Sequence, residues 1–260
     1  MLFSVSYLSK TKQKADEIKC PYNQLGVIWG FIKEYPDKRI NIVAVSVDEE
    51  DLDRLFREVD TVKSAVDDNY TVTCGDFSLL QTMLTKGYNA CFKFPVTDWE
   101  GFGVLKSLGV SDIYIDGPLG FQTDRLIQAK GGIKIRVSPS LSPNAAPSAS
   151  PNLNSFFIRP EDLDKYSEII DVIDFMESDL DRESTLLDIY RRRSFPYNLA
   201  LLIPNLNIQV ENIFIHDSFA ANRLNCGQKC KIPGYSCHIC ENETRVTNQL
   251  LQYFGKYRPN

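Results

Sequence analysis

The segment YTVTCGDFSLLQTMLTKGYNACFKFPVTDWEGFGVLKSLGVSDIYIDG, residues 70–117, alternates short β-rich runs with segments of helical spacing. Asp76 and Asp98 stand where the N-caps of two helices are expected. Gly87 and Gly109 stand where those helices should end. Strands that alternate with helices in this way predict βαβ units and a parallel sheet. The three β-rich runs of this segment are 70–74, 90–96 and 112–117.

The same rhythm continues on both sides of this segment. Helical spacing is found at 49–66, 120–132 and 180–193. Eight β-rich runs in all predict an α/β fold, a (β/α)8 TIM-like barrel, which usually has ~250 residues. A doubly wound sheet is the alternative, but no glycine-rich phosphate loop follows the first run. The remaining five runs are 2–8, 40–47, 133–138, 155–160 and 171–176.

The chain divides into two predicted parts. Residues 1–200 form the barrel, and residues 201–260 form a C-terminal extension. Within the barrel, residues 138–154 are rich in Ser, Pro, Asn and Ala, which is typical of an irregular loop. This loop is either a surface linker or a lid, because loops that follow barrel strands lie at the active-site end.

Bulk composition limits the classes of function. The chain has 260 residues, 43% hydrophobic and 24% charged, which is an ordinary balance for a soluble globular protein. A formal net charge of -5 argues against a protein that coats nucleic acid. No run approaches the roughly 18 apolar residues of a membrane span. The N-terminus places its apolar run before its lysines, the reverse of a signal peptide, so we expect a cytoplasmic protein that does not associate with membranes.

Polar residues at the ends of the predicted strands should face the reaction site of a barrel. Three of them are basic and could bind a small anionic substrate, while an acidic one could orient it. In an alternative interpretation, Lys93 and Arg136 point into the barrel as a structural charge pair. Asp48, like the two N-caps above, is interpreted as a helix cap. The predicted substrate-binding residues are Lys93, Asp116, Arg136 and Arg159.

Histidine is too scarce for ordinary triad hydrolysis. The chain has only His216 and His238, and His238 lies inside a CHIC sequence. The remaining candidate stands in FIHDSF, where His, Asp and Ser are adjacent in sequence and cannot form a triad together. No HExxH, P-loop or EF-hand pattern is present, so the catalytic residues stay unassigned.

Four of the seven cysteines stand within fifteen positions of the extension. In a reducing compartment such a cluster favours metal binding over disulfides. A Pro-Gly turn between the two pairs would bring them together. Soft thiolate ligands suit Zn²⁺ or an iron–sulfur cluster, and spacing alone mildly favours zinc, because CxxC pairs in small cytosolic modules are commonly zinc sites. The predicted metal ligands are Cys226, Cys230, Cys237 and Cys240.

Two segments resemble the collagenase-like peptidase (U-32) family. Residues 158–192, IRPEDLDKYSEIIDVIDFMESDLDRESTLLDIYRR, resemble one segment of that family. Residues 222–231, NRLNCGQKCK, are similar to its cysteine segment. Here the cysteine segment follows the first segment, whereas in the family it precedes it. The positions that match the cysteine segment are Asn222, Arg223, Cys226, Gln228 and Cys230.

The resemblance implies a barrel-type catalytic domain whose cysteines hold a [4Fe-4S] cluster. It also implies a role in hydroxylating tRNA uridines or ubiquinone precursors rather than in proteolysis. We therefore expect an iron–sulfur enzyme or enzyme subunit that acts in hydroxylation or RNA modification, with a small anionic substrate or RNA as its partner. The alternative is a non-catalytic protein whose zinc knuckle docks a protein or nucleic-acid partner through the extension.

Overall fold

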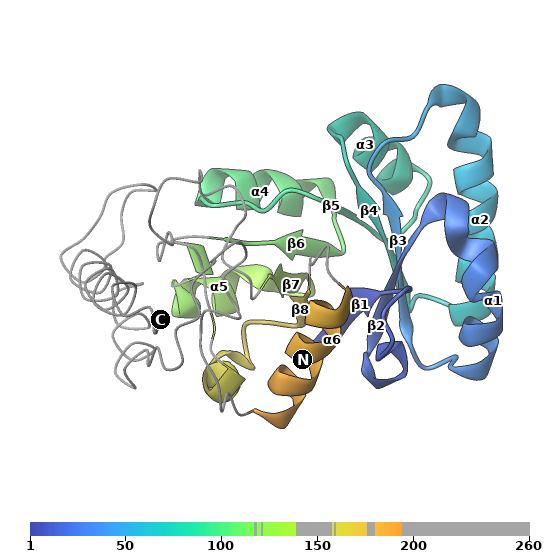
Figure 1. Ribbon diagram of the computed structural model, residues 1–260. Coiled ribbons are helices and arrows are strands. Elements are labelled where there is room, and N and C mark those ends of the chain that lie inside the picture. Colours follow the sequence, from blue (N-terminus) through green and yellow to red (C-terminus); the bar gives the residue numbers. More distant parts are fainter. Residues whose placement is uncertain (117–118, 121, 139–157, 159, 176–179, 194–260) are drawn as a thin grey trace, which may run out of the picture.

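The computed structural model describes residues 1–116, 119–120, 122–138, 158, 160–175 and 180–193. Eight parallel strands follow one another in chain order and close into a barrel, because the last strand pairs with the first. Figure 1 shows helices packed around this barrel. The predicted α/β fold with a TIM-like barrel is therefore confirmed. The strands are β1 (Leu2–Ser6), β2 (Glu17–Pro21), β3 (Arg39–Ala44), β4 (Tyr70–Cys74), β5 (Ala90–Phe92), β6 (Asp112–Tyr114), β7 (Lys134–Val137) and β8 (Val172–Asp174).

Helices connect the strands and cover the outside of the barrel. Short 3-10 segments stand at 12–14, 22–24, 49–51 and 160–166. Among the described residues no helix has the length and apolar character needed to cross a membrane. The α-helices are α1 (Leu25–Glu34), α2 (Leu52–Val66), α3 (Phe77–Thr85), α4 (Trp99–Leu108), α5 (Thr123–Lys130) and α6 (Leu180–Arg192).

One of the eight predicted strands is wrong, and one strand of the barrel was not predicted. The run at 155–160 does not supply a barrel strand, because β7 pairs directly with β8 and Pro160 begins a 3-10 helix. The missing strand is β2, which pairs with both β1 and β3. Its sequence, EIKCP, alternates charged and apolar residues and ends in proline, so it lacks the continuous apolar run that marked the others.

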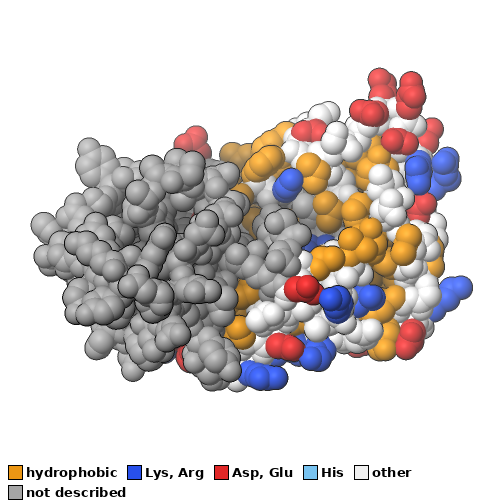
Figure 2. Space-filling view, in the orientation of Figure 1, with side chains coloured by type: hydrophobic (Ala, Val, Ile, Leu, Met, Phe, Trp, Pro, Cys, Tyr) orange, Lys and Arg blue, Asp and Glu red, His pale blue; other side chains and the backbone are white. Residues whose placement is uncertain are grey.

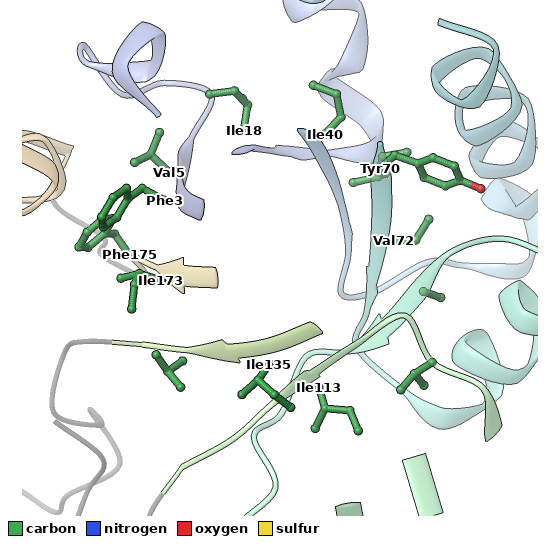
Figure 3. Close-up of a cluster of buried hydrophobic side chains, with 14 of the residues drawn as sticks. Phe3, Val5, Ile18, Ile40, Tyr70, Val72, Ile113, Ile135, Ile173 and Phe175 are labelled. Atoms are coloured by element: carbon green, nitrogen blue, oxygen red, sulfur yellow. The ribbon is translucent and has the colours of Figure 1, made fainter. Parts of the chain in front are cut away.

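The outward side chains of the strands form the hydrophobic core between barrel and helices. Successive residues of a strand point to opposite faces, so every second residue of each strand faces the helices. These outward residues are almost entirely aliphatic or aromatic, and Figure 3 draws part of this cluster. The residues labelled there are at most 5% exposed: Phe3, Val5, Ile18, Ile40, Tyr70, Val72, Ile113, Ile135, Ile173 and Phe175.

Local capping fixes the helices that follow β4 and β5. The Asp76 carboxylate accepts a hydrogen bond from the backbone N–H of Leu79 at 2.8 Å. Asp98 accepts one from Gly101 at the same distance, and Gly109 ends α4 in the left-handed conformation with φ +81°. These predicted caps are confirmed. Asp48 differs, since its side chain makes no capping hydrogen bond.

Gly75 is required where β4 leaves the barrel. A Cβ atom at this position would lie 1.8 Å from the backbone carbonyl oxygen of Val45, a distance that no relaxed structure allows. We expect Gly75→Ala to lower the free energy of unfolding by about 3 kcal/mol, the upper end for overpacking, because backbone atoms must move.

The matched control is Gly30→Ala. Gly30 lies inside α1, where an added Cβ meets nothing within 4 Å. This change should raise the free energy of unfolding by about 0.5–1 kcal/mol through helix propensity. Chemical denaturation of both variants measures the difference. Equal effects of the two changes would contradict the steric role of Gly75.

Candidate functional site in the barrel interior

The strand registers arrange the inward side chains in layers. In a TIM barrel, each layer takes one residue from every second strand. Starting from Lys19 on β2, we follow the strand pairing around the barrel and move one residue towards the carboxyl end at each new strand. This path takes an inward side chain from β4, β6 and β8 and returns to Lys19. We call this layer, which lies towards the carboxyl ends of the strands, the upper layer. It consists of Lys19, Thr73, Tyr114 and Asp174.

A middle layer comes from the odd-numbered strands and a lower layer again from the even-numbered ones. Branched aliphatic residues usually dominate such positions. Here Val172 is the single aliphatic side chain among the twelve positions of the three layers. The middle layer is Ser4, Asn41, Cys91 and Arg136, and the lower layer is Glu17, Thr71, Asp112 and Val172.

Arg136 joins the three layers. Its Nη1 atom lies 3.0 Å from Glu17 Oε2 and 3.1 Å from Asp112 Oδ1, both in the layer below. Its Nη2 atom donates to Glu17 Oε1 and lies 3.5 Å from Asp174 Oδ2 in the layer above. The side chain is fully buried. One guanidinium group therefore compensates part of the negative charge of three carboxylates, which stand on three different strands.

Arg39 completes the network at the lower end of the barrel. Its two Nη atoms donate to the two carboxylate oxygens of Asp112 at 2.7 and 2.8 Å, a bidentate pair. Nη1 also lies 3.3 Å from Glu17. The Nε–H groups of Arg39 and Arg136 are buried, and neither has a hydrogen-bond partner among the described residues.

The upper layer carries a second cluster, centred on the fully buried carboxylate of Asp174. Lys19 Nζ donates to Asp174 Oδ1 at 2.5 Å and to the backbone oxygen of Phe175 at 2.7 Å. The hydroxyl of Tyr114 donates to Asp174 Oδ2. The guanidinium carbon of Arg136 lies 5.1 Å from the centroid of the Tyr114 ring. One carboxylate thus orients a lysine and a tyrosine at the carboxyl end of the barrel.

Within the hydrogen-bonded network the charges balance, because the cations Lys19, Arg39 and Arg136 are paired with three carboxylates. Lys134, at the start of β7, is a further cation beside this network, and burial and the charge of Arg39 lower its pKa. Burial by itself raises the pKa of Asp112, but hydrogen bonds from Arg39 and the charges of Arg136 and Arg39 outweigh burial and lower that pKa. Burial also raises the pKa of Asp174, but the charges of Lys19 and Arg136 outweigh burial and lower that pKa. Both carboxylates are therefore ionised at neutral pH.

Burial keeps Tyr114 and the described cysteines protonated. Burial and the Asp174 charge raise the pKa of Tyr114 well above its ordinary value, although Arg136 opposes them. Burial, with a further contribution from Asp112, raises the pKa of Cys91 to about 12. Cys91 lies 3.3 Å from the Thr73 hydroxyl and, as a thiol, serves as packing. Cys20 and Cys74 are also buried, free cysteines, which leaves no activated thiolate among the described residues.

The residues above the upper layer form the rim of the barrel. Strand alternation places Ser6, Val43, Lys93 and Ser138 there, and all four are partly exposed. Lys93 continues the ladder beyond β5, since its N–H donates to the Cys74 carbonyl at 2.9 Å. Its Nζ lies 5.9 Å from the centroid of the Phe94 ring.

Exposed apolar side chains follow three neighbouring strands near Lys93. Val45 follows β3, Phe77 begins α3 after β4, and Phe94 follows β5. Phe92 links the last two, with ring centroids 4.7 Å from Phe77 and 5.4 Å from Phe94. In the coloured part of Figure 2, hydrophobic side chains gather in the middle and most charged ones lie toward the edge. This rim can accommodate the hydrocarbon part of a ligand.

The predicted substrate-binding residues occupy different places. Lys93 and Asp116 lie at the carboxyl end of the barrel, where the sequence predicted them, and the Asp116 N–H donates to Val96 at 3.0 Å. Arg136 lies in the middle layer with its Nη atoms on carboxylates, the internal structural charge that the alternative interpretation expected, although its partners are acidic residues and not Lys93. Arg159 lies outside the described residues.

The predicted metal centre is also outside the described part of the chain, as are the loop at 139–154 and the extension. Within the described residues, no group of three or more His, Cys, Asp or Glu side chains is arranged to hold a metal ion. Binding of zinc or an iron–sulfur cluster by Cys226, Cys230, Cys237 and Cys240 therefore stays a prediction from the sequence.

Sequence reasoning missed the upper layer. Lys19 went unnoticed because β2 was not recognised, and Tyr114 and Asp174 were counted only as parts of apolar runs. A signal was present in two of these strands. β2 and β6 carry charged or hydroxyl groups at every second position, which is the pattern of a strand with one polar face, whereas in β8 the inward positions are Val172 and Asp174.

The comparisons with known proteins add little beyond this geometry. No family model and no curated protein matches the chain. A structure described as native KDPGal aligns with TM-score 0.45 and 9% identity over 74% of this chain and 92% of its own. A glycerol uptake operon antiterminator-related protein from Thermotoga maritima aligns with TM-score 0.43 and 12% identity over 74% of this chain and 99% of its own.

A third similar structure is 3-keto-L-gulonate-6-phosphate decarboxylase from Vibrio cholerae. It aligns with TM-score 0.40 and 8% identity over 74% of this chain and 96% of its own. Similarity at this level carries no conclusion about activity or substrate, and the fold rests on the strand topology of this chain itself. That topology identifies the chain as a TIM-barrel protein, and ion pairs line the interior of its barrel.

Proposed function

We propose that this chain is an enzyme, or a subunit of one, that acts on a small polar or anionic molecule at the carboxyl end of its barrel. The upper layer carries this proposal. Its buried carboxylate, Asp174, holds Lys19 and Tyr114 at the end of the barrel where the reactions of this fold take place. Ordered acidic, basic and phenolic groups at such a position are what general acid–base chemistry requires.

The energetics of the interior support a functional interpretation. Buried ion pairs contribute little net stability, because desolvation offsets their mutual attraction. Replacing them with apolar residues of similar volume is often neutral or stabilising. A barrel that served only as a scaffold would be at least as stable with aliphatic layers, so the polar interior points to a role in chemistry.

This interpretation predicts the effect of replacing the Asp174 cluster. Lys19→Met alone leaves Asp174 without its closest cation and should lower the free energy of unfolding by about 3 kcal/mol. The triple variant Lys19→Met/Tyr114→Phe/Asp174→Leu removes all three polar groups together. It should match the wild-type stability or exceed it by about 1–4 kcal/mol.

Guanidinium chloride denaturation of the single and triple variants measures both values. Lys33→Met serves as the control, because Lys33 is exposed in the last turn of α1. If the triple variant were less stable than Lys19→Met, the cluster would be a stabilising element of the fold. The argument from energetics for an enzyme would then fail.

The second part of the proposal concerns the extension. From the spacing and the resemblance, we propose that Cys226, Cys230, Cys237 and Cys240 bind a metal centre, with a [4Fe-4S] cluster as the first candidate and Zn²⁺ as the alternative. When bound, the cluster would supply redox chemistry, and hydroxylation or RNA modification is the reaction class that the resemblance to the collagenase-like peptidase family suggests. With zinc, the extension would instead be a knuckle that docks a partner.

Anaerobic purification separates these alternatives. Protein with an iron–sulfur cluster should be brown, with broad absorption near ~400 nm. Colourless protein with stoichiometric zinc would replace the iron–sulfur proposal with the zinc knuckle. Cys226→Ser and Cys237→Ser should each reduce the metal content, and Cys91→Ser, at a buried cysteine inside the barrel, is the control. Unchanged metal content in both of the first two variants would exclude the metal centre.

A further inference from the structure

We propose that the carboxyl end of the barrel binds a small monoanionic oxo or hydroxy compound, with its oxo or hydroxyl oxygen on Lys19 and its anionic group towards Lys93. This inference rests on the proposed function and names a substrate class for the same site. Three observations carry it: the remaining donor of Lys19, the charge compensation within the interior, and the position of Lys93 on the rim.

In the upper layer, the ammonium group of Lys19 has one N–H left that could donate a hydrogen bond to a ligand. The hydroxyl of Tyr114 donates a hydrogen bond to Asp174, and the hydroxyl of Thr73 donates one to Asn41 Oδ1 at 2.7 Å. The ammonium group of Lys19 has three protons. Two are used by Asp174 and the Phe175 carbonyl, and no third acceptor for Lys19 is found among the described residues.

The exposure of the upper layer leads to the same residue. The Lys19 side chain is 15% exposed, whereas Thr73, Tyr114 and Asp174 are 5%, 4% and 0% exposed. Lys19 is thus the polar side chain of this layer that solvent reaches most easily. A ligand that enters from the carboxyl end would meet its third N–H first.

Charge compensation limits what can be placed on Lys19. The carboxylate of Asp174 already compensates the lysine, and below it Arg39 and Arg136 are paired with Glu17 and Asp112. A dianion on this layer would be desolvated without a matching positive charge, which is strongly unfavourable. A neutral carbonyl or hydroxyl oxygen needs only the one N–H that Lys19 provides. The upper layer therefore favours an uncharged oxygen.

Lys93 supplies the uncompensated charge for the other end of the ligand. Its side chain is partly exposed on the rim, and no carboxylate lies within ion-pair distance of it among the described residues. β5 stands three strands from β2 in the eight-stranded barrel, so Lys93 follows a strand that lies nearly opposite the strand of Lys19. Apolar side chains next to Lys93, including Phe94, would contact the hydrocarbon part between the two ends.

Two matched acids test the proposal on the full-length protein. 2-Oxobutyrate and butyrate have the same chain length and charge and differ in the oxo group. Lysine-selective NMR should show 2-oxobutyrate shifting the signals of both Lys19 and Lys93. Its affinity should exceed that of butyrate by about tenfold, the usual value of one hydrogen bond from a charged donor. Inorganic phosphate, added at a pH well above its second pKa so that it is a dianion, should affect Lys93 and leave Lys19 unchanged.

Variants assign the two ends of the ligand. The triple variant Lys19→Met/Tyr114→Phe/Asp174→Leu, designed to keep its stability, should bind the two acids equally. Lys93→Met should lower the affinity for both acids by about tenfold and leave the ratio of the two affinities unchanged. Lys33→Met should change neither affinity. Equal binding of the two acids to the wild-type protein, or a phosphate-induced shift at Lys19, would overturn the substrate class. Neither result would alter the unfolding free energies of Lys19→Met and the triple variant, on which the enzyme proposal depends.

Discussion

Arg136→Met is expected to lower the free energy of unfolding by about 3–5 kcal/mol, enough to unfold many domains of ordinary stability. The substitution keeps most of the hydrocarbon volume of the side chain and removes its guanidinium group. Glu17 and Asp112 then lose a direct ion-pair partner, and Asp174 loses a cation at 3.5 Å. Buried carboxylates without a partner are among the most destabilising changes that a core can carry.

The control for this prediction is Arg57→Met on the exposed face of α2. It makes the same chemical change at the surface and should alter stability by less than about 0.5 kcal/mol. Arg136→Lys provides a second comparison, because a lysine keeps the charge but loses the planar fork that contacts two carboxylates at once. Its stability should fall between those of the wild type and Arg136→Met. Equal stabilities of the Arg57 and Arg136 variants would contradict the network as described.

The elements predicted most accurately are those that local rules determine. β4 has the bounds that its apolar run predicted, and α3 and α4 begin after the aspartates that were predicted to cap them. These signals depend on residues within a few positions of each other. A capping carboxylate, for example, binds a backbone N–H three residues later, as Asp76 does with Leu79.

The interior could not be predicted in the same way, because its contacts join distant parts of the sequence. Arg136 contacts Glu17, 119 residues earlier, and Lys19 contacts Asp174, 155 residues later. β2 was missed for a related reason. A continuous apolar run marks a strand that is covered by apolar side chains on both faces, whereas in β2 Glu17 and Lys19 point inward and Ile18 points outward. When the barrel interior is polar, the sequence of a strand contains as many polar residues as a loop, and a search for apolar runs overlooks it.

The same comparison explains why Arg136 was proposed as a substrate-binding residue. A basic residue near a strand end is common to a ligand site and to a buried ion-pair network, and the sequence does not state its partners. What separates the two is the supply of carboxylates on the other strands. Glu17, Asp112 and Asp174 become neighbours only when the barrel closes.

The protein should lose much of its stability as the pH falls below about 4, and the buried carboxylates should account for a large part of the loss. In the folded state the pKa of Asp112 is lowered, because hydrogen bonds from Arg39 and nearby positive charges outweigh the effect of burial. The pKa of Asp174 is lowered in the same way by Lys19 and Arg136. In the unfolded chain an aspartate has a pKa of about 3.9.

A folded-state pKa below the unfolded value gives stability that is complete above the unfolded pKa and disappears as the pH falls through the folded one. The free energy of unfolding, measured in guanidinium chloride, should therefore be nearly constant from pH 7 to 5 and fall steeply from about pH 4 downward. Each such carboxylate can contribute a slope of up to about 1.4 kcal/mol per pH unit. Asp112→Asn should make the slope shallower by up to that amount and reduce stability at pH 7, since Arg39 and Arg136 lose an anionic partner.

The control is Asp53→Asn, at an exposed position in the first turn of α2, which should leave the slope in acid unchanged. A wild-type slope that Asp112→Asn does not reduce would mean that other groups bind the protons taken up on unfolding. In that case the buried network would not be the origin of the acid sensitivity. A reduced slope, together with the loss of stability in Arg136→Met, would show that carboxylates and guanidinium groups in the barrel interior are mutually dependent, because each is tolerated there only while its partner is charged.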